Sequence, residues 1–399
     1  MDTLANRLAL FAGRSLDELR AQLAVDSESI LKRDDVQRPV SGGPYRLAIV
    51  NADAQRLALA QRVIDGGAPW RGRKDVWFAS SSLLGEQGGR VALIFPGLEQ
   101  RFEPVLDDIA THFNLPHLDL TNSKRSVREH SIALLATGRL LDTALRAIGI
   151  EPAAVAGHSI GEWNAMMAAG LISPASMNSF VYGVDPTVFE LPNCVFVALG
   201  CGVEIAEEAI TGLENVLISH DNCPHQSIIC GEQDVIAIAV ARLNQRGVST
   251  RVLNFRSGFH SPFLAPYLHM VSDVAKLPIE LGIIPAWSAT TTQPFPTEEQ
   301  AIRDLMIRHL LEPVRFRTLI ENLYASGIRA FIQVGVGSIT GFIDDTLAGR
   351  DYVTIAANVA GQPGMRQLRR TAAALWVEGA QLQLDQLVVA NSDAFAAAD

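Results

Sequence analysis

Apolar runs alternate with amphipathic helical patterns along residues 90–170, and this alternation constrains the fold more than any other feature. Segment 90–97 (RVALIFPG) is almost entirely apolar, which is typical of a strand buried on both faces of a parallel sheet. Segment 127–150 has the spacing of an amphipathic helix, and 153–159 (AAVAGHS) returns to an apolar strand followed by a helical pattern. Repeated strand–helix units of this kind predict an α/β fold with a parallel sheet.

The strand at 153–159 runs into a turn in which Gly157 and Gly161 flank Ser159. A G-x-S-x-G pattern between a strand and a helix is the setting of a nucleophile elbow, where only glycine leaves room for the neighbouring backbone. The following helix directs its N-terminus at the serine, which favours negative charge there. The alternative is a structural turn whose serine merely caps the helix. The strand and helix on either side favour Ser159 as a nucleophile.

A serine nucleophile requires a base and two donors for the oxyanion. His260 is the best candidate base among nine histidines, because it follows an apolar segment and lies in a Ser/Gly turn. His158 is adjacent in sequence, but the backbone direction disfavours a hydrogen bond from its ring to Ser159. The backbone amides of Ile160 and of Leu98, in the loop after the first apolar strand, are the expected oxyanion donors.

The composition excludes several classes of protein. With 48% hydrophobic and 19% charged residues, the 399-residue chain can form two or three domains with sizeable cores. A net charge of −10 argues against nucleic acid or an anionic membrane as the main partner. No apolar run reaches the ~18 residues of a membrane span, and the N-terminus lacks a signal-peptide pattern. These features predict a cytoplasmic protein.

The four cysteines form no CxxC pair and lie in one stretch of the middle of the chain. A zinc site would require tighter ligand spacing than Cys194, Cys201, Cys223 and Cys230 provide. Ordinary reduced thiols are the expectation for such residues in a cytosolic protein. We therefore predict neither disulfides nor a metal site.

Changes of pattern along the chain predict its domain organisation. Residues 1–89 are expected to form a small α/β unit. Residues 90–186 and 251–355 should form the large unit with the parallel sheet. Two βαβ-like repeats in 187–250 suggest an inserted ferredoxin-like subdomain, and 356–399 form a helical C-terminal segment.

Together these segments resemble the acyltransferase domains of polyketide synthases, in the family of malonyl-CoA:acyl-carrier-protein transacylase. The motifs that carry the resemblance are GHSIGE (157–162), NCPHQSIICGE (222–232), GFHSPF (258–263), LLEPVRF (310–316) and QVGVGS (333–338). The resemblance covers the whole chain and implies an α/β-hydrolase-like large domain. Residues 1–89 look like the linker between a ketosynthase and an acyltransferase, and 375–387 look like the segment that follows such domains.

The resemblance implies a ping-pong acyl transfer. Ser159 would attack an acyl thioester such as acyl-CoA with His260 as general base, and the phosphopantetheine thiol of an acyl carrier protein would then accept the acyl group. No tightly bound cofactor is implied. The expected partners are a carrier protein and other polyketide synthase domains. Arg366, Arg369 and Arg370 are one candidate cluster for docking an acidic carrier.

The resemblance also assigns residues that support the site. A main-chain or amide oxygen, rather than an Asp, orients the catalytic histidine in this family. His309 stands where relatives carry Gln or Asn, and Asn222 is a candidate for the same pocket. Phe259 matches the residue before the histidine in malonyl-type domains, and His158 is the expected neighbour of the nucleophile.

Two departures from the family pattern concern the substrate. The usual FPGQGSQ loop reads FPGLEQR here, so Glu99 is expected to reshape the mouth of the pocket. Val184 stands where transferases of dicarboxylic acyl groups carry an arginine that binds the free carboxylate. No Arg or Lys occurs between Glu162 and Arg242, and the nearby Gly and Pro residues predict a shortened helix. An unpaired buried carboxylate costs several kcal/mol, so we expect an acyl group without one.

Alternatives remain open from the sequence. A distant cation such as Arg256 could replace the missing arginine, and Phe259 itself favours a malonyl-CoA-specific transferase. An acyl hydrolase that releases acyl groups from carriers would use the same residues, with water attacking the acyl-serine. A non-catalytic scaffold is disfavoured because Ser159 and His260 are both present.

Overall fold

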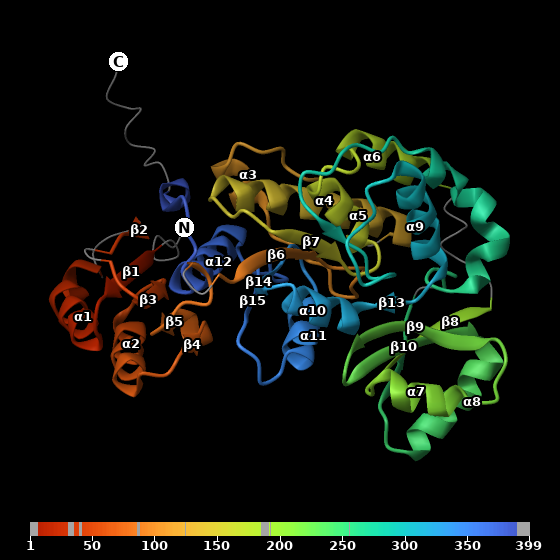
Figure 1. Cartoon of the computed structure of the whole chain (residues 1–399), viewed down its shortest axis with the longest axis horizontal. Coiled ribbons are helices and arrows are strands. Elements are labelled where there is room, and N and C mark those ends of the chain that lie inside the picture. The colour runs from red at the N-terminus through yellow and green to blue at the C-terminus, as the bar shows by residue number, and fades with distance from the viewer. Residues whose placement is uncertain are drawn as a thin grey trace.

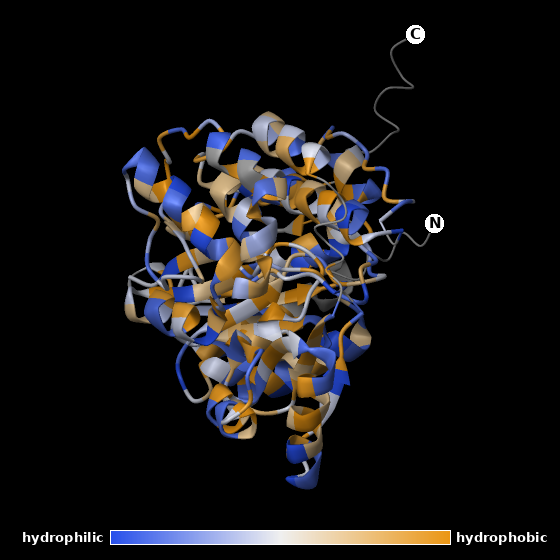
Figure 2. Ribbon diagram, turned by 90° about the vertical axis from the view of Figure 1, so that its right-hand side faces the viewer, coloured by the Kyte–Doolittle hydropathy of each residue, from blue (hydrophilic) through white to orange (hydrophobic). Residues whose placement is uncertain are grey.

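Three five-stranded sheets organise the chain, one after another along the long axis of the molecule (Figure 1). The computed structural model describes residues 7–30, 36–39, 42–85, 88–123, 125–184, 191, 193–254 and 256–388. In a view along the long axis, hydrophobic residues are frequent toward the middle of the molecule, and hydrophilic residues are frequent on the outer helical turns and loops (Figure 2). Among the described residues, no helix has the length and hydropathy that crossing a bilayer requires.

The N-terminal unit is a mostly antiparallel sheet in the order β2-β1-β3-β5-β4, covered by two helices. Its elements are β1 (Leu8–Gly13), α1 (Leu16–Ile30), β2 (Val36–Gln37), β3 (Tyr45–Val50), α2 (Ala54–Gly66), β4 (Trp70–Arg71), η2 (Arg73–Asp75) and β5 (Val76–Ala79). The sequence predicts β1, β3 and β5, whereas β2 and β4 are too short to leave a pattern. Ser15 Oγ accepts from Glu18 N at 3.2 Å and caps the N-terminus of α1.

The central sheet is entirely parallel, in the order β12-β7-β6-β14-β15. Its strands are β6 (Arg90–Phe95), β7 (Ala154–Gly157), β12 (Ala286–Trp287), β14 (Ile328–Gln333) and β15 (Val353–Ala356). Leu93 and Phe95 point to one face, while Ala92 and Ile94 point to the other, and all four are buried. This double burial is the physical reason for the apolar runs in the sequence.

Helices cover both faces of the central sheet. One face packs on α3 (Asp107–His112), α4 (Val127–Ala147), α5 (Gly161–Ala168) and α12 (Gly364–Val377). The other packs on α10 (Phe316–Ala325) and α11 (Ile339–Thr346). Further out lie α6 (Pro174–Gly183), η5 (Pro262–Lys276), α9 (Glu299–Leu311) and η6 (Leu384–Leu387). η5 is a 3-10 helix that contains Pro266, which has no backbone N–H to donate.

The third sheet has the order β11-β8-β10-β9-β13, with α7 and α8 on its outer face. Its elements are β8 (Cys194–Leu199), α7 (Val203–Ile210), β9 (Val216–Cys223), β10 (Gln226–Glu232), α8 (Gln233–Gln245), β11 (Thr250–Val252) and β13 (Val314–Arg315). Two of these strands correct the predicted boundaries. β11 runs across the predicted border at 250, and β13, expected in the large unit, pairs with β9. Strand pairing thus connects the third sheet to the unit that contains the central sheet.

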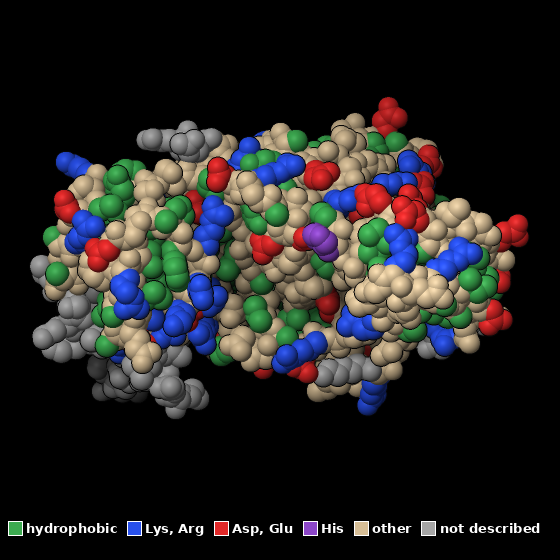
Figure 3. All heavy atoms as spheres, turned by 90° about the horizontal axis from the view of Figure 1, so that it is seen from below, with side chains coloured by type: hydrophobic (Ala, Val, Ile, Leu, Met, Phe, Trp, Pro, Cys, Tyr) green, Lys and Arg blue, Asp and Glu red, His purple; other side chains and the backbone are tan. Residues whose placement is uncertain are grey.

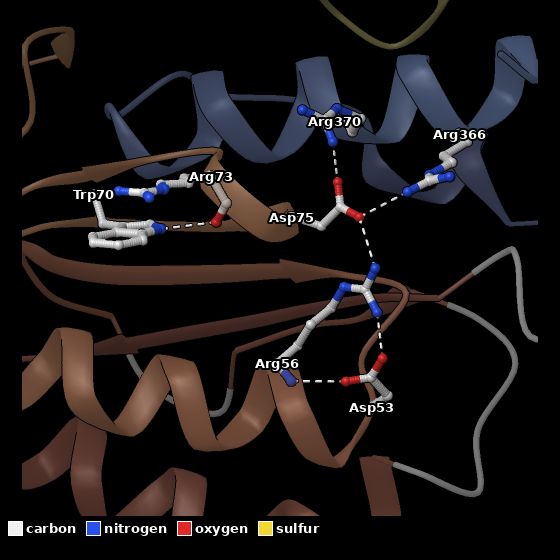
Figure 4. Close-up of polar contacts among 7 residues, drawn as sticks. All are labelled: Asp53, Arg56, Trp70, Arg73, Asp75, Arg366 and Arg370. Carbon is white, nitrogen blue, oxygen red and sulfur yellow. Dashed lines mark hydrogen bonds and ion pairs between the residues drawn. The ribbon is translucent and has the colours of Figure 1, made fainter. Parts of the chain in front are cut away.

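Helix α12 fastens the N-terminal sheet to the central sheet, because it packs on β3, β5 and β15. The carboxylate of Asp75 is buried at this junction and pairs with three arginines (Figure 4). Arg56 and Arg366 contact it at 3.0 and 2.9 Å, and Arg370 binds its other oxygen. Lys and Arg side chains gather along the border between these units (Figure 3).

The arginine cluster suggested for carrier docking is therefore part of an internal junction. Arg366 and Arg370 are bound to Asp75, and Arg369 is 1% exposed and donates to the carbonyl of Leu387 at 2.8 Å. This arrangement does not favour the docking hypothesis, because Arg369 is buried and the partly exposed Arg366 and Arg370 already pair with Asp75.

Candidate active site

Ser159 lies in the turn between β7 and α5, at the C-terminal end of the parallel sheet, with a positive φ of 54°. This left-handed conformation is strained for a residue with a side chain. The flanking glycines permit it. A Cβ on Gly157 would lie 2.1 Å from Glu162 N, and one on Gly161 would lie 2.2 Å from the carbonyl oxygen of Phe95. The turn therefore requires both glycines for the reason that the motif suggests.

His260 contacts the serine directly. Its Nε2 lies 2.7 Å from Ser159 Oγ, and its Nδ1 lies 2.9 Å from the carbonyl oxygen of His309. A carbonyl only accepts, so Nδ1 carries the proton and Nε2 can accept the proton of the hydroxyl. The backbone N–H of His260 also donates to Leu310 O at 2.8 Å, which fixes the histidine turn on the end of α9. This main-chain orientation of the ring is the one that the resemblance implies.

The electrostatics of the site keep this ring uncharged. Burial lowers the pKa of His260 well below its ordinary range, and the nearby His309 and His158 lower that pKa further. A neutral imidazole is the form that can act as a base toward Ser159.

The two expected oxyanion donors flank the serine. Ile160 follows it in the turn, and a Cβ on Gly97 would lie 3.4 Å from Ser159 Cβ, which brings the loop containing Leu98 against the same turn. Within the described ranges, neither the N–H of Leu98 nor that of Ile160 has a hydrogen-bond partner in the protein. Both amides are thus available to a substrate oxygen.

Glu99 faces a neighbouring loop. Its carboxylate accepts from both the N–H and the hydroxyl of Ser338 at 2.8 Å, and burial raises the pKa of Glu99. The side chain thereby ties the loop after β6 to the glycine-rich loop after β14. The hydrogen bonds to Ser338 accommodate Glu99 in the FPGLEQR loop, and this contact is not evident from the sequence.

Four histidines converge at the site. The ring of His260 lies 5.1 Å from that of His309 and 5.0 Å from that of His220, which is 5.4 Å from that of His158. His158 Nε2 contacts Asn222 Oδ1 at 2.7 Å, so its ring is directed away from Ser159 as expected. The position of His220 is not evident from the sequence, because polar residues interrupt the apolar pattern of β9.

Glu162, the last residue of the GHSIGE motif, is a second site residue whose role is not evident from the sequence. It is 1% exposed, lies 3.3 Å from Nδ1 of His309 and accepts from the N–H of Ala289 at 2.9 Å. The carboxylate thus anchors the ring of His309, whose carbonyl orients His260.

Val184 ends α6 and is buried, as the shortened helix predicts. Pro186, part of that prediction, lies outside the described residues. A cavity of about 420 Å³ lies between α6 and η5, and Val184, Phe180 and Lys276 are among its lining residues. Lys276 pairs with Asp273 at 2.6 Å. Phe259 is half-buried against the main core, and Arg256 is exposed.

Two arginines of α4 reach α6, and both already have partners. Arg128 donates to the carbonyl of Tyr182 and lies over its ring, while Arg139 donates to Asn178 Oδ1 at 3.1 Å. The cysteines are buried free thiols. Within the described part of the chain, no group of three or more His, Cys, Asp or Glu side chains is arranged to hold a metal ion.

Comparison with known proteins assigns the family. The model of the acyl transferase domain matches residues 80–381, which include every site residue described above. The chain belongs to the acyl transferase domain family. This acyl transferase domain also resembles, in fold, the acyltransferase domain from module 8 of the salinomycin polyketide synthase, with a TM-score of 0.77 at 19% identity over 95% of this chain and 97% of that one.

Two curated relatives of the domain differ greatly in how much of their own length the match covers. It is 25% identical over 349 residues to the phenolphthiocerol synthesis polyketide synthase Pks15/1 of Mycobacterium marinum, covering 78% of this chain but only 16% of the synthase. It is 26% identical over 269 residues to the malonyl CoA-acyl carrier protein transacylase of Bacillus subtilis, covering 64% of this chain and 82% of the transacylase. The chain therefore spans a small part of the multidomain relative.

Proposed function

We propose that this acyl transferase domain moves an acyl group from an acyl thioester, through acyl-Ser159, to the phosphopantetheine thiol of an acyl carrier protein. The observation that carries the proposal is the 2.7 Å contact between Ser159 Oγ and His260 Nε2, with the opposite ring nitrogen held by a main-chain carbonyl. This is the geometry of an activated nucleophile and its base. Membership of the acyl transferase domain family supports it.

The reaction follows from the protons that each group holds. Ser159 gives its hydroxyl proton to Nε2 of His260 as Oγ attacks the thioester carbonyl, and the amides of Leu98 and Ile160 hold the oxyanion. The C–S bond then breaks, and His260 returns the proton to the departing thiolate. In the second half, the carrier thiol gives its proton to Nε2 of His260 and its sulfur attacks the acyl-serine carbonyl. The bond between the acyl carbon and Oγ then breaks, and His260 returns the proton to Oγ of Ser159.

The proposed acyl group lacks a free carboxylate. Val184 is apolar and buried at the family's arginine position. The nearby Arg128 and Arg139 donate to Tyr182 and Asn178, and Lys276 forms an exposed ion pair with Asp273. A malonyl carboxylate would have to be desolvated there without a bidentate partner, which costs several kcal/mol. A starter unit or a longer monoacyl chain avoids this cost.

The domain assignment belongs to the same proposal. Residues 1–89 serve as a linker subdomain of the ketosynthase-to-acyltransferase type, and the large unit is α/β-hydrolase-like. The strand order β11-β8-β10-β9, with a helix after β8 and another after β10, supports a ferredoxin-like small subdomain, to which β13 adds a fifth strand. Residues 356–399 would be the segment that follows acyltransferase domains.

Intact-mass measurement of acyl-Ser159 with a panel of acyl-CoAs tests the proposal. Acetyl and longer monoacyl donors should label the protein at least tenfold faster than malonyl-CoA, and Ser159→Ala should abolish labelling. Equal malonyl labelling would overturn the substrate assignment, and full activity of Ser159→Ala would overturn the mechanism. Rapid loss of the label to water, with no transfer to any holo-carrier protein, would identify an acyl hydrolase instead.

A further inference from the structure

His220 is a buried histidine that the proposed reaction does not use. It lies in β9, where it pairs with Ile228 of β10 and Val314 of β13, and it is 4% exposed. Its ring meets the ring of His260 at 77° and stacks on that of His158 at 21°. The side chain therefore stands beside the base and beside the residue that precedes the nucleophile.

The hydrogen bonds around His220 fix its tautomer. Ser219 Oγ donates its single proton to the carbonyl of Ile228 at 3.1 Å, so its 2.9 Å contact with Nδ1 of His220 must be accepted by the serine oxygen. Nδ1 therefore carries the proton. Burial and the neighbouring histidines hold the pKa of His220 well below its ordinary range, so the ring is neutral and Nε2 presents a lone pair.

The lone pair at Nε2 calls for a hydrogen-bond donor. Among the described residues none donates to Nε2, and this atom is not one of the fully buried polar atoms left without a partner, so it is open to a donor from a ligand. An acyl carbonyl or a carboxylate only accepts and cannot fill this role. Acyl-CoA and a charged carrier protein share one donor close to the thioester, which is the amide N–H separated from the sulfur by two methylene groups.

We propose that Nε2 of His220 accepts a hydrogen bond from this first pantetheine amide, and so aligns the thioester with Ser159 in both half-reactions. The inference rests on the proposed function, because it requires a pantetheine thioester at the site. His220 is a binding residue in this scheme, and proton transfer remains with His260.

The test compares two thioesters of the same acyl group. One is the N-acetylcysteamine thioester, and the other is the S-(4-oxopentyl) thioester, in which a methylene replaces the N–H and the carbonyl is kept. The rate of acyl-Ser159 formation at limiting thioester should be about tenfold higher for the amide in the unmodified protein, the size expected for one buried hydrogen bond. In His220→Phe, which keeps a flat ring without an acceptor, the ratio should fall to about one.

Two further variants complete the experiment. His220→Gln retains an acceptor oxygen and should keep a severalfold preference for the amide, whereas the remote, exposed His117→Phe should behave as the unmodified protein. Equal rates for the two thioesters in the unmodified protein would overturn the inference even if His220→Phe does not fold. An unchanged tenfold ratio in folded His220→Phe would overturn it as well. Absence of any acyl-Ser159 would instead contradict the proposed function.

Discussion

At the scale of single residues, the site is built from two strained turns that face each other. Ser159 and His260 both have positive φ, at 54° and 61°. The carbonyl of Ser159 accepts from Glu162 N within its own turn, whereas the N–H of His260 donates to Leu310 O at the end of α9. Such conformations persist only where the surroundings determine them fully. Here the strain directs two side chains from distant parts of the chain at a common point.

The lowered pKa of His260 predicts the pH dependence of acylation. The base must be neutral, so activity is lost as pH falls through its pKa, which burial holds well below the usual 6.5. The rate of acyl-Ser159 formation should therefore stay constant from pH 8 to pH 6.5 and decline only in more acidic buffer. Single-turnover labelling at each pH measures this rate, and a half-maximal rate at pH 6.5 or above would contradict the prediction.

The close packing of the serine turn predicts a large effect of one methyl group. Gly157→Ala forces a Cβ against backbone atoms that cannot move independently, so we expect a loss of roughly 2–4 kcal/mol in the free energy of unfolding. Gly66→Ala is the matched control, because no atom lies within 4 Å of its Cβ position and it ends helix α2. Urea denaturation of both variants measures the difference, and equal stabilities would disprove the argument.

At the scale of elements, the positions of α12 and of β13 matter most. α12 lies far from the N-terminal unit in the sequence, yet it joins the N-terminal sheet to the central one. β13 joins the central unit to the third sheet. The three units are therefore connected through shared elements as well as through the chain. The proposed catalytic groups come from the turn after β7, the turn before η5 and the end of α9, so their alignment depends on these connections.

Asp75 provides a test of the junction formed by α12. Asp75→Ala leaves Arg56, Arg366 and Arg370 facing one another without their carboxylate, and we expect a loss of about 3 kcal/mol in the free energy of unfolding. Asp17→Ala, which removes an 88% exposed carboxylate from Arg20, should change stability by less than about 1 kcal/mol. Thermal and urea unfolding compare them, and a neutral Asp75→Ala would show that the junction does not depend on the charge pairs.

At the scale of the whole molecule, buried neutral histidines link stability to pH. In a folded protein whose histidine pKa is lowered, the unfolded chain binds more protons below pH 6.5, so stability falls as pH decreases from 6.5 toward the folded pKa. His130 is an example outside the catalytic cluster, since burial lowers its pKa to about 4 beside the ring of Phe102.

Replacing His130 isolates this contribution. When the pH is lowered from 6.5 to 5.5, the free energy of unfolding of His130→Leu should fall by about 1 kcal/mol less than that of the unmodified protein. The reason is that the unfolded chain of the variant no longer binds a proton at residue 130. His117→Leu, at an exposed position, should follow the unmodified protein. Urea titrations at both pH values measure the difference, and parallel pH dependences for all three proteins would contradict the assignment.

The sequence alone determined the features that depend on neighbours along the chain. The parallel-sheet strands follow from apolar runs, the serine turn from its glycines, and the candidate roles of Ser159 and His260 from local context and family motifs. Tertiary structure decided what depends on residues far apart. It placed His220 and Glu162 at the site, turned Glu99 to Ser338, and paired two arginines of α12 with Asp75. These contacts join distant segments, and the periodicity of one segment carries no information on the partner that will cover it.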